Sequence, residues 1–300
     1  MKRAVVPLLF TLSVVVLCLA WQQPAKRPKI FGIAAVQISA SDMHAAYDFY
    51  SKVLSRPEPL PMDKATGSGL HVNDTQIVIL TTTSSSSPAN SLGEIAFATN
   101  DVRALRRYLE FHKVDVSVGD GAKDNYLTVF DPEGQRISFV EWPTDVIKQL
   151  DAKPKSARLI HAGFVVRNRA AEDHFYREIF GFHVYWHGGM KDDETNWVDM
   201  QVPDGTDWIE YMLNVPANAD HHTLGVMNHI ALGVPDIHAA EAQLRKNGWS
   251  GTEQPKIGRD GKWQLNLYDP DDTRVEFMEF TPVQKPCCSE YNGPHPGPKQ

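Results

Sequence analysis

The stretch Asp269-Pro-Asp-Asp-Thr-Arg-Val-Glu-Phe277 decides the fold, because a related stretch, Asp131-Pro-Glu-Gly-Gln-Arg-Ile-Ser-Phe139, stands 138 residues earlier. Each begins with an Asp-Pro turn and continues as a strand in which apolar and polar residues alternate. A repeat at this separation indicates that the chain contains duplicated supersecondary units. We interpret the two stretches as the closing strands of the second and the fourth unit.

Four copies of one unit, consisting of a strand, an amphipathic helix and further strands, follow from the spacing of the apolar residues. The first strands are expected at residues 33–38, 93–98, 158–166 and 227–234, and the helices after Ser41-Asp42, from Val102 to Leu109, from Ala170 to Phe180 and from Asp236 to about Gly248. The sequence therefore predicts an α+β fold of four βαβββ modules. They should pair into two domains, each with outer helices and a cup-shaped mixed sheet.

The predicted domains cover residues 30–142 and 158–281, and a polar linker, residues 143–157, joins them. The N-terminal residues 1–20 combine basic residues with an apolar run and small residues before Trp21, which is typical of a secretory signal peptide. We therefore expect an exported protein, periplasmic or secreted, that is not stably inserted in a membrane after cleavage. A retained N-terminal membrane anchor is the alternative.

The C-terminal tail, residues 282–300, is rich in Pro and Gly and contains the adjacent Cys287 and Cys288. We expect it to lie extended over the surface. The two cysteines could instead form a vicinal disulfide, act as a redox switch or, together with His295, bind a soft metal. No disulfide framework is expected, since the only other cysteine is Cys18 in the signal peptide.

The overall composition is that of an ordinary globular protein, with 300 residues, 42% hydrophobic residues and a net charge of −7. These values exclude a wholly disordered chain and a collagen-like fibre. They give no support for nucleic-acid binding, which needs a basic surface. The expected partner is a small-molecule substrate, and a homo-oligomer is compatible with the sequence.

Two histidines and two carboxylates occupy matching positions in the third and fourth units. His161 and His229 lie on the first strands of these units, and Glu210 and Glu276 lie on the last strands, 49 and 47 residues further on. A pseudo-twofold arrangement of the units would bring all four together. Imidazole and carboxylate ligands suit Zn, Ni, Fe or Mn, so the sequence predicts one divalent metal ion. Four solvent-facing residues on an open sheet are the alternative.

Strand alternation supports this interpretation, because it turns Glu276 into the cup while Val275 and Phe277 face the helices. The first half lacks the ligands: Glu94 and Ser138 stand at the positions of the fourth unit's histidine and glutamate. One metal site per chain, in the second half, is therefore expected.

Weaker candidates for substrate contacts lie on the middle strands of the third and fourth units. They are His187, Trp197, Gln264 and Asn266, accompanied by Trp186, Met200, Lys262 and Trp263. Many of these could equally belong to the core or the rim. His221 and His222, between the two units, are expected on the surface.

On these motifs the chain resembles the vicinal oxygen chelate superfamily, which includes glyoxalase I, extradiol dioxygenases, fosfomycin and bleomycin resistance proteins and methylmalonyl-CoA epimerase. The resemblance covers about residues 30–280. Extradiol dioxygenases hold Fe(II) with two His and one Glu, and His161, His229 and Glu276 match that triad. Their catalytic Tyr and His do not carry over: Asn266 stands at the Tyr position, and no His lies between His238 and His295.

The fourth candidate ligand, Glu210, is similar to the His/Glu/His/Glu set of glyoxalase I and the epimerases. That resemblance implies a metal that polarises a substrate oxygen while Glu276, the mobile base partnered by Glu210, moves a proton between adjacent carbons. The function expected from the sequence is thus a metal-dependent lyase or isomerase of the glyoxalase type. The alternatives are an extradiol-type Fe(II) dioxygenase and a non-catalytic, resistance-type protein that binds a small molecule.

Overall fold

The structure is a computed structural model that describes residues 26–54, 59–60, 68–83, 91–117, 125–143, 146 and 157–297. The predicted signal peptide, most of the predicted linker and the last three residues of the tail lie outside the described residues. None of the described helices is long and apolar enough to cross a membrane.

The first half contains two of the predicted βαβββ units. Its elements are β1 (Ile30–Ala40), α1 (Met43–Leu54), β2 (Pro59–Leu60), β3 (Ser68–His71), β4 (Ile77–Thr82), β5 (Leu92–Thr99), α2 (Val102–Phe111), β6 (Tyr126–Phe130) and β7 (Arg136–Glu141). The strands form one mixed sheet in the order β2-β3-β4-β1-β5-β7-β6.

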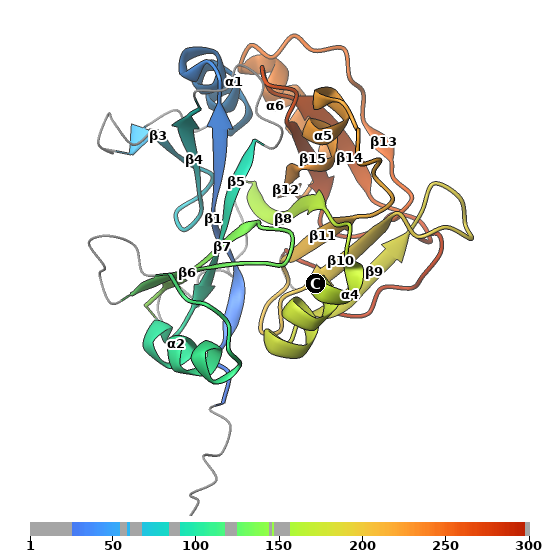
Figure 1. Cartoon of the computed structure of the whole chain (residues 1–300). Coiled ribbons are helices and arrows are strands. Elements are labelled where there is room, and N and C mark those ends of the chain that lie inside the picture. The colour runs from blue at the N-terminus through green and yellow to red at the C-terminus, as the bar shows by residue number, and fades with distance from the viewer. Residues whose placement is uncertain are drawn as a thin grey trace, which may run out of the picture.

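The second half repeats this plan. Its elements are β8 (Arg158–Val165), α4 (Arg169–Asp173), the π-helix η1 (His174–Ile179), β9 (His183–Gly188), β10 (Trp197–Gln201), β11 (Trp208–Met212), α5 (His221–Met227), β12 (His229–Val234), α6 (Ile237–Lys246), β13 (Lys256–Ile257), β14 (Trp263–Tyr268) and β15 (Arg274–Glu279). The sheet order is β13-β14-β15-β12-β8-β11-β10-β9, and this sheet curls into a half-barrel (Figure 1).

Both sheets have the same pseudo-twofold pairing. The first strands of two units form a central antiparallel pair, β1 with β5 and β8 with β12. Each central strand also pairs in parallel with the last strand of its own unit, as in β8 with β11 and β12 with β15. The prediction of a duplicated α+β fold with mixed sheets is confirmed.

Short-range signals explain where the helices begin. The carboxylates of Asp101 and Asp236 accept hydrogen bonds from backbone N–H groups three residues further on and so cap α2 and α6. The strand alternation inferred from the sequence also holds, since Val275 and Phe277 pack in the main hydrophobic core.

The repeated Asp-Pro stretches connect the two halves. Asp269 accepts a hydrogen bond from the Tyr50 hydroxyl at 3.1 Å, and Asp131 accepts one from Tyr176 at 3.0 Å. Each aspartate therefore meets a tyrosine from a helix of the opposite half. Together with the continuous core, these contacts place α1 beside the fourth unit and η1 beside the second (Figure 1).

A buried ion pair lies at the same junction. Arg158, at the start of β8, pairs with Asp207, whose side chain is fully buried. Asp207 also accepts a hydrogen bond of 2.9 Å from the backbone N–H of Ile33 on β1. The carboxylate thus fixes the second half against the central strand of the first.

Candidate metal centre

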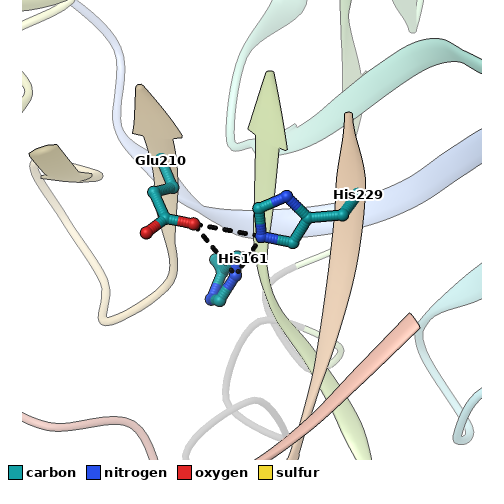
Figure 2. A group of neighbouring side chains, drawn as sticks. All are labelled: His161, Glu210 and His229. Atoms are coloured by element: carbon teal, nitrogen blue, oxygen red, sulfur yellow. Dashed lines mark hydrogen bonds and ion pairs between the residues drawn. The ribbon is translucent and has the colours of Figure 1, made fainter. Parts of the chain in front are cut away.

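The four predicted ligands lie on the four adjacent central strands of the half-barrel. His161 and His229 project from the antiparallel pair β8 and β12, and Glu210 and Glu276 project from the flanking strands β11 and β15. Figure 2 shows the side chains of His161, His229 and Glu210 pointing toward one another from three strands. The pseudo-twofold pairing thus brings together residues that are far apart in the sequence.

Two imidazoles and one carboxylate form the tightest group. His161 Nε2 lies 3.1 Å from His229 Nε2, and Glu210 Oε2 lies 3.0 Å from His229 Nε2 and 3.8 Å from His161 Nε2. One ligand atom from each residue fits within a span of 4.8 Å. Glu276 Oε2 is 3.6 Å from His161 Nε2 but lies outside this three-residue group.

A glycine makes room for one of the histidines. A Cβ atom added to Gly163 on β8 would lie 2.0 Å from His229 Cε1, so any larger residue would displace the imidazole. On the other side, the His161 ring packs against the Trp208 ring at a centroid distance of 4.9 Å. Backbone and aromatic packing therefore position both histidines without using their Nε2 atoms.

Burial determines the charges of the four side chains. Burial lowers the pKa of both histidines well below the ordinary value, and the positive charge of Arg274 lowers them further. Burial also raises the pKa of Glu210 and of Glu276 to about 7, against the opposing effect of Arg274. Near neutral pH the site therefore has neutral imidazoles beside carboxylates that take up or release protons easily.

Hydrogen bonds fix the tautomer of His229. Its Nδ1–H donates to the Met227 carbonyl at 3.1 Å, and its Nε2 accepts from Arg274 Nη2 at 2.7 Å. A histidine whose Nδ1–H is bound to a backbone carbonyl has its Nε2 lone pair available for a metal. The donor set, two imidazole nitrogens with carboxylate oxygens, fits a divalent cation such as Fe(II), Zn, Ni or Mn.

Arg274 contacts the candidate ligands, although the sequence pattern did not single it out. It lies on β15, two residues before Glu276 and on the same face of the strand. Its guanidinium contacts the Nε2 atom that would ligate a metal, and it lies 4.0 Å from Glu210 Oε2. Metal binding therefore requires Arg274 to give up its hydrogen bond to His229.

Three of the four predicted ligands, His161, Glu210 and Glu276, line a cavity of about 730 Å³, whereas His229 does not line it. Of the substrate candidates, Trp186, Trp197, Gln264 and Asn266 line this cavity. His187, Met200, Lys262 and Trp263 do not line it: Met200 is buried in the main core, and the His187 backbone binds Ser289 of the tail. As expected, His222 is exposed at the surface and His221 is only partly buried.

Besides His161 Nδ1 and Arg274 Nε, two further buried polar atoms of cavity-lining residues have no hydrogen-bond partner within the described part of the chain. They are Asn266 Oδ1 and Asp199 Oδ1. Burial, reinforced by the charge of Glu210, raises the pKa of Asp199 well above the ordinary value. Because unpaired polar atoms are costly in a protein interior, these two are suited to binding a polar ligand.

Beneath the cavity, Lys262 is fully buried and surrounded by aromatic rings. Its Nζ atom lies 4.6 Å from the centre of the Trp208 ring, 5.1 Å from that of Tyr291 and 5.4 Å from that of Tyr185. Burial lowers the pKa of Lys262, and the charge of Asp260 opposes that shift. Lys262 thus connects the packing of Trp208, which supports His161, to the C-terminal tail.

The first half has an ion pair at the equivalent position. Glu94 pairs with Arg136 at 3.2 Å, and it also accepts a hydrogen bond of 2.5 Å from Tyr126. The Tyr126 hydroxyl lies 2.8 Å from Ser138, the residue at the position of Glu276. The charges at this position therefore compensate one another within the protein, as expected for a half that lacks the ligand set.

The C-terminal tail lies over the surface and crosses the open side of the half-barrel, where its backbone is hydrogen-bonded to Arg259 and Tyr185. Cys287 lines the cavity and forms a disulfide with Cys288. His295, proposed from the sequence as a partner of these cysteines, forms a hydrogen bond with the Tyr185 hydroxyl instead. The structure thus agrees with the vicinal-disulfide alternative and makes the tail part of the cavity wall.

A family model described as Glyoxalase/Bleomycin resistance protein/Dioxygenase superfamily matches residues 32–139 and 158–277. No curated protein matches the chain. An extradiol ring-cleaving dioxygenase from B. fuscum is similar in structure, with 20% sequence identity and a TM-score of 0.62 over 90% of this chain and 76% of that chain.

Two further structures give the same result. Homoprotocatechuate 2,3-dioxygenase from Brevibacterium fuscum, in complex with 3,4-dihydroxyphenylacetate, has 18% identity and a TM-score of 0.61 over 85% of this chain and 82% of that chain. The enzyme from Arthrobacter globiformis has 18% identity and a TM-score of 0.61 over 86% and 82% of the two chains. At these identities the likeness establishes a shared fold.

Proposed function

The chain belongs to the glyoxalase/bleomycin resistance protein/dioxygenase superfamily, and on that premise we propose that it is an extradiol-type, Fe(II)-dependent dioxygenase. Its substrate would be a small aromatic compound with two adjacent hydroxyl groups. The observation that carries this proposal is the convergence of His161, His229 and Glu210 beside a cavity. Two histidines and one carboxylate with open positions are typical of non-haem Fe(II) oxygenases.

The choice of carboxylate differs from the one implied by the family resemblance, which pointed to Glu276 as the third ligand. The Glu210 carboxylate lies closer to the imidazoles, because its Oε2 atom is 3.0 Å from His229 Nε2. Glu276 approaches only His161, at 3.6 Å. We therefore assign Glu210 to the metal and leave Glu276 available for proton transfer.

The protein's own groups supply binding and proton transfer. Bound Fe(II) would supply a Lewis-acidic centre for the adjacent substrate oxygens and for dioxygen. Trp186 and Trp197 in the cavity wall would contact the aromatic ring. Glu276, with a pKa raised to about 7, would accept a proton from a substrate hydroxyl, and Asp199, whose pKa is raised well above its ordinary value by burial, would donate one.

One observation favours glyoxalase-type proton transfer as a second candidate. Glu276 is the fourth member of the site and its second carboxylate, and its raised pKa suits a base that moves a proton between adjacent carbons. Asn266, paired with Glu276 across β14 and β15, stands where the dioxygenases have their catalytic Tyr. The proton-transfer reaction needs neither that Tyr nor dioxygen.

Oxygen uptake distinguishes these candidates. Protein loaded anaerobically with Fe(II) is mixed with catechol or 3,4-dihydroxyphenylacetate in air-saturated buffer, and oxygen consumption and product mass are measured. The dioxygenase proposal expects a product with the mass of the substrate plus one O₂. His229→Ala should abolish the reaction, whereas the matched variant His187→Ala, outside the cavity wall, should retain it.

Other outcomes would contradict the dioxygenase assignment. If oxygen is not consumed but the metal-loaded protein incorporates solvent deuterium into an α-hydroxyketone such as dihydroxyacetone, the proton-transfer candidate is favoured. If catechol binds without oxygen uptake or turnover, the protein is better described as a small-molecule-binding member of the superfamily.

A further inference from the structure

Hydrogen bonds from both edges of the half-barrel hold the cysteine pair in place. The backbone N–H of Cys287 donates to the Arg259 carbonyl, in the connection between β13 and β14, at 2.9 Å. The N–H of Asn292 donates to the Tyr185 carbonyl on β9 at 2.8 Å. The tail therefore bridges the first and last strands of the curled sheet and fixes Cys287 in the cavity wall.

The disulfide between Cys287 and Cys288 is unsuited to a stabilising role. A disulfide stabilises a fold mainly by restricting a loop of the unfolded chain, and more so for longer loops. This bridge joins neighbouring residues and closes no loop of chain. Hydrogen bonds already hold the tail in place, so the presence of two adjacent cysteines needs an explanation other than stability.

A carboxylate and a guanidinium lie beside the sulfur atoms. Asp192 Oδ, Cys287 Sγ and Cys288 Sγ lie within 4.8 Å of one another. Arg259 Nη2 lies 3.7 Å from Cys288 Sγ and forms an ion pair with Asp192. A nearby guanidinium favours the thiolate form of a cysteine, so the reduced pair is poised to present two anionic sulfurs next to a carboxylate.

We propose that Cys287, Cys288 and Asp192 form a second metal-binding site, specific for a thiophilic divalent cation and available when the disulfide is reduced. Two equivalents of a thiol break the S–S bond and leave as a disulfide, and the two protein thiols then lose their protons to the buffer when the cation binds. Two thiolates and one carboxylate contribute three negative charges. Arg259 and the cation balance them.

The ligand type separates this site from the one formed by the histidines. Thiolates select soft cations, whereas imidazole and carboxylate also accept harder ones. Arg259, Asp192 and Cys287 line the same cavity as His161 and Glu210. The cavity would thus have a redox-dependent soft-metal site in its wall, and this inference does not depend on the reaction proposed above.

Cadmium binding tests the proposal. The full-length protein is prepared in the oxidised form and, in parallel, is reduced with excess 2-mercaptoethanol and desalted under argon. Each form is dialysed against Cd²⁺, and bound cadmium is measured by elemental analysis. Reduced protein should bind one more Cd²⁺ per chain than oxidised protein and should gain a thiolate-to-cadmium absorption band in the ultraviolet.

Variants separate the two sites. Replacing both Cys287 and Cys288 by Ser should remove the additional ion and the band, which also controls for the thiol of Cys18. Asp192→Asn should weaken the additional site by about tenfold. His229→Ala should keep the thiolate band. Equal cadmium in the two redox forms, or an additional ion that persists in the double Ser variant, would overturn the proposal.

Discussion

Acidification is expected to weaken metal binding at the histidine site between pH about 7 and about 5, because the bound cation displaces protons from the carboxyl group that binds it and from the one beside it. The pKa of Glu210 and of Glu276 is raised to about 7 by burial. Below that value both side chains hold a proton in the metal-free protein. The affinity should therefore rise with pH and level off above about 7.

The expected slope follows from the number of protons displaced. Each proton that the metal displaces changes the affinity about tenfold per pH unit. Glu210 would lose its proton as a metal ligand, and the charge of the ion would expel the proton of the neighbouring Glu276, so the affinity should fall about 100-fold per unit below pH 7. The histidines add no proton in this range, since burial keeps their pKa well below the ordinary value.

Calorimetric titration with Zn²⁺ in buffers of different ionisation enthalpy counts these protons directly. We expect about two protons released at pH about 6 and fewer than one at pH about 8. Glu276→Gln should reduce the count at the lower pH by about one, while the control Glu178→Gln, an exposed residue of η1, should leave it unchanged. A proton count that is equal at the two pH values would show that the glutamates do not release protons when the metal binds.

Three further variants test the surroundings of the site. Gly163→Ala, whose Cβ would lie 2.0 Å from His229 Cε1, should weaken metal binding by about 10- to 100-fold in a Zn²⁺ titration without altering a ligand. Asp207→Ala leaves the buried Arg158 without its carboxylate and should lower the free energy of unfolding in urea by about 3–5 kcal/mol. Glu172→Gln should raise it by about 2 kcal/mol at neutral pH, because burial raises the pKa of this acid to about 9 and stability is lost as pH rises toward that value.

Each variant has a clear contradictory result. Wild-type zinc affinity in Gly163→Ala would show that the His229 ring does not need the space above the glycine. An unchanged urea midpoint in Asp207→Ala would show that the junction between the halves does not depend on the ion pair. If the stability depends on pH in the same way in Glu172→Gln and in the wild type, the titration of Glu172 is not the cause of that dependence.

The local elements and the meeting of the two histidines could be predicted from the sequence because their signals are short-range or repeated. Asp101 and Asp236 mark helix starts, and strand alternation assigns Glu276 to the cavity. The positions of His161 and His229 in equivalent units predicted that they would meet, and they lie 3.1 Å apart.

The remaining features depend on contacts between distant segments and left no local pattern. The sequence around Asp131 and Asp269 predicts only turns. Their side chains also accept hydrogen bonds from tyrosines of the opposite half. Arg274 belongs to an ordinary strand pattern, and only the register of β15 brings it to His229. The path of the tail, and thus the place of Cys287 in the cavity wall, follows from tertiary hydrogen bonds alone.

The most direct test of the metal centre is an anomalous difference map from crystals of the Co²⁺-loaded protein. We expect one peak at bonding distance, about 2.0–2.2 Å, from His161 Nε2, His229 Nε2 and a Glu210 oxygen. Arg274 should turn away from His229. Crystals in which the ion binds elsewhere, or in which these three side chains show no peak at saturating Co²⁺, would contradict the account.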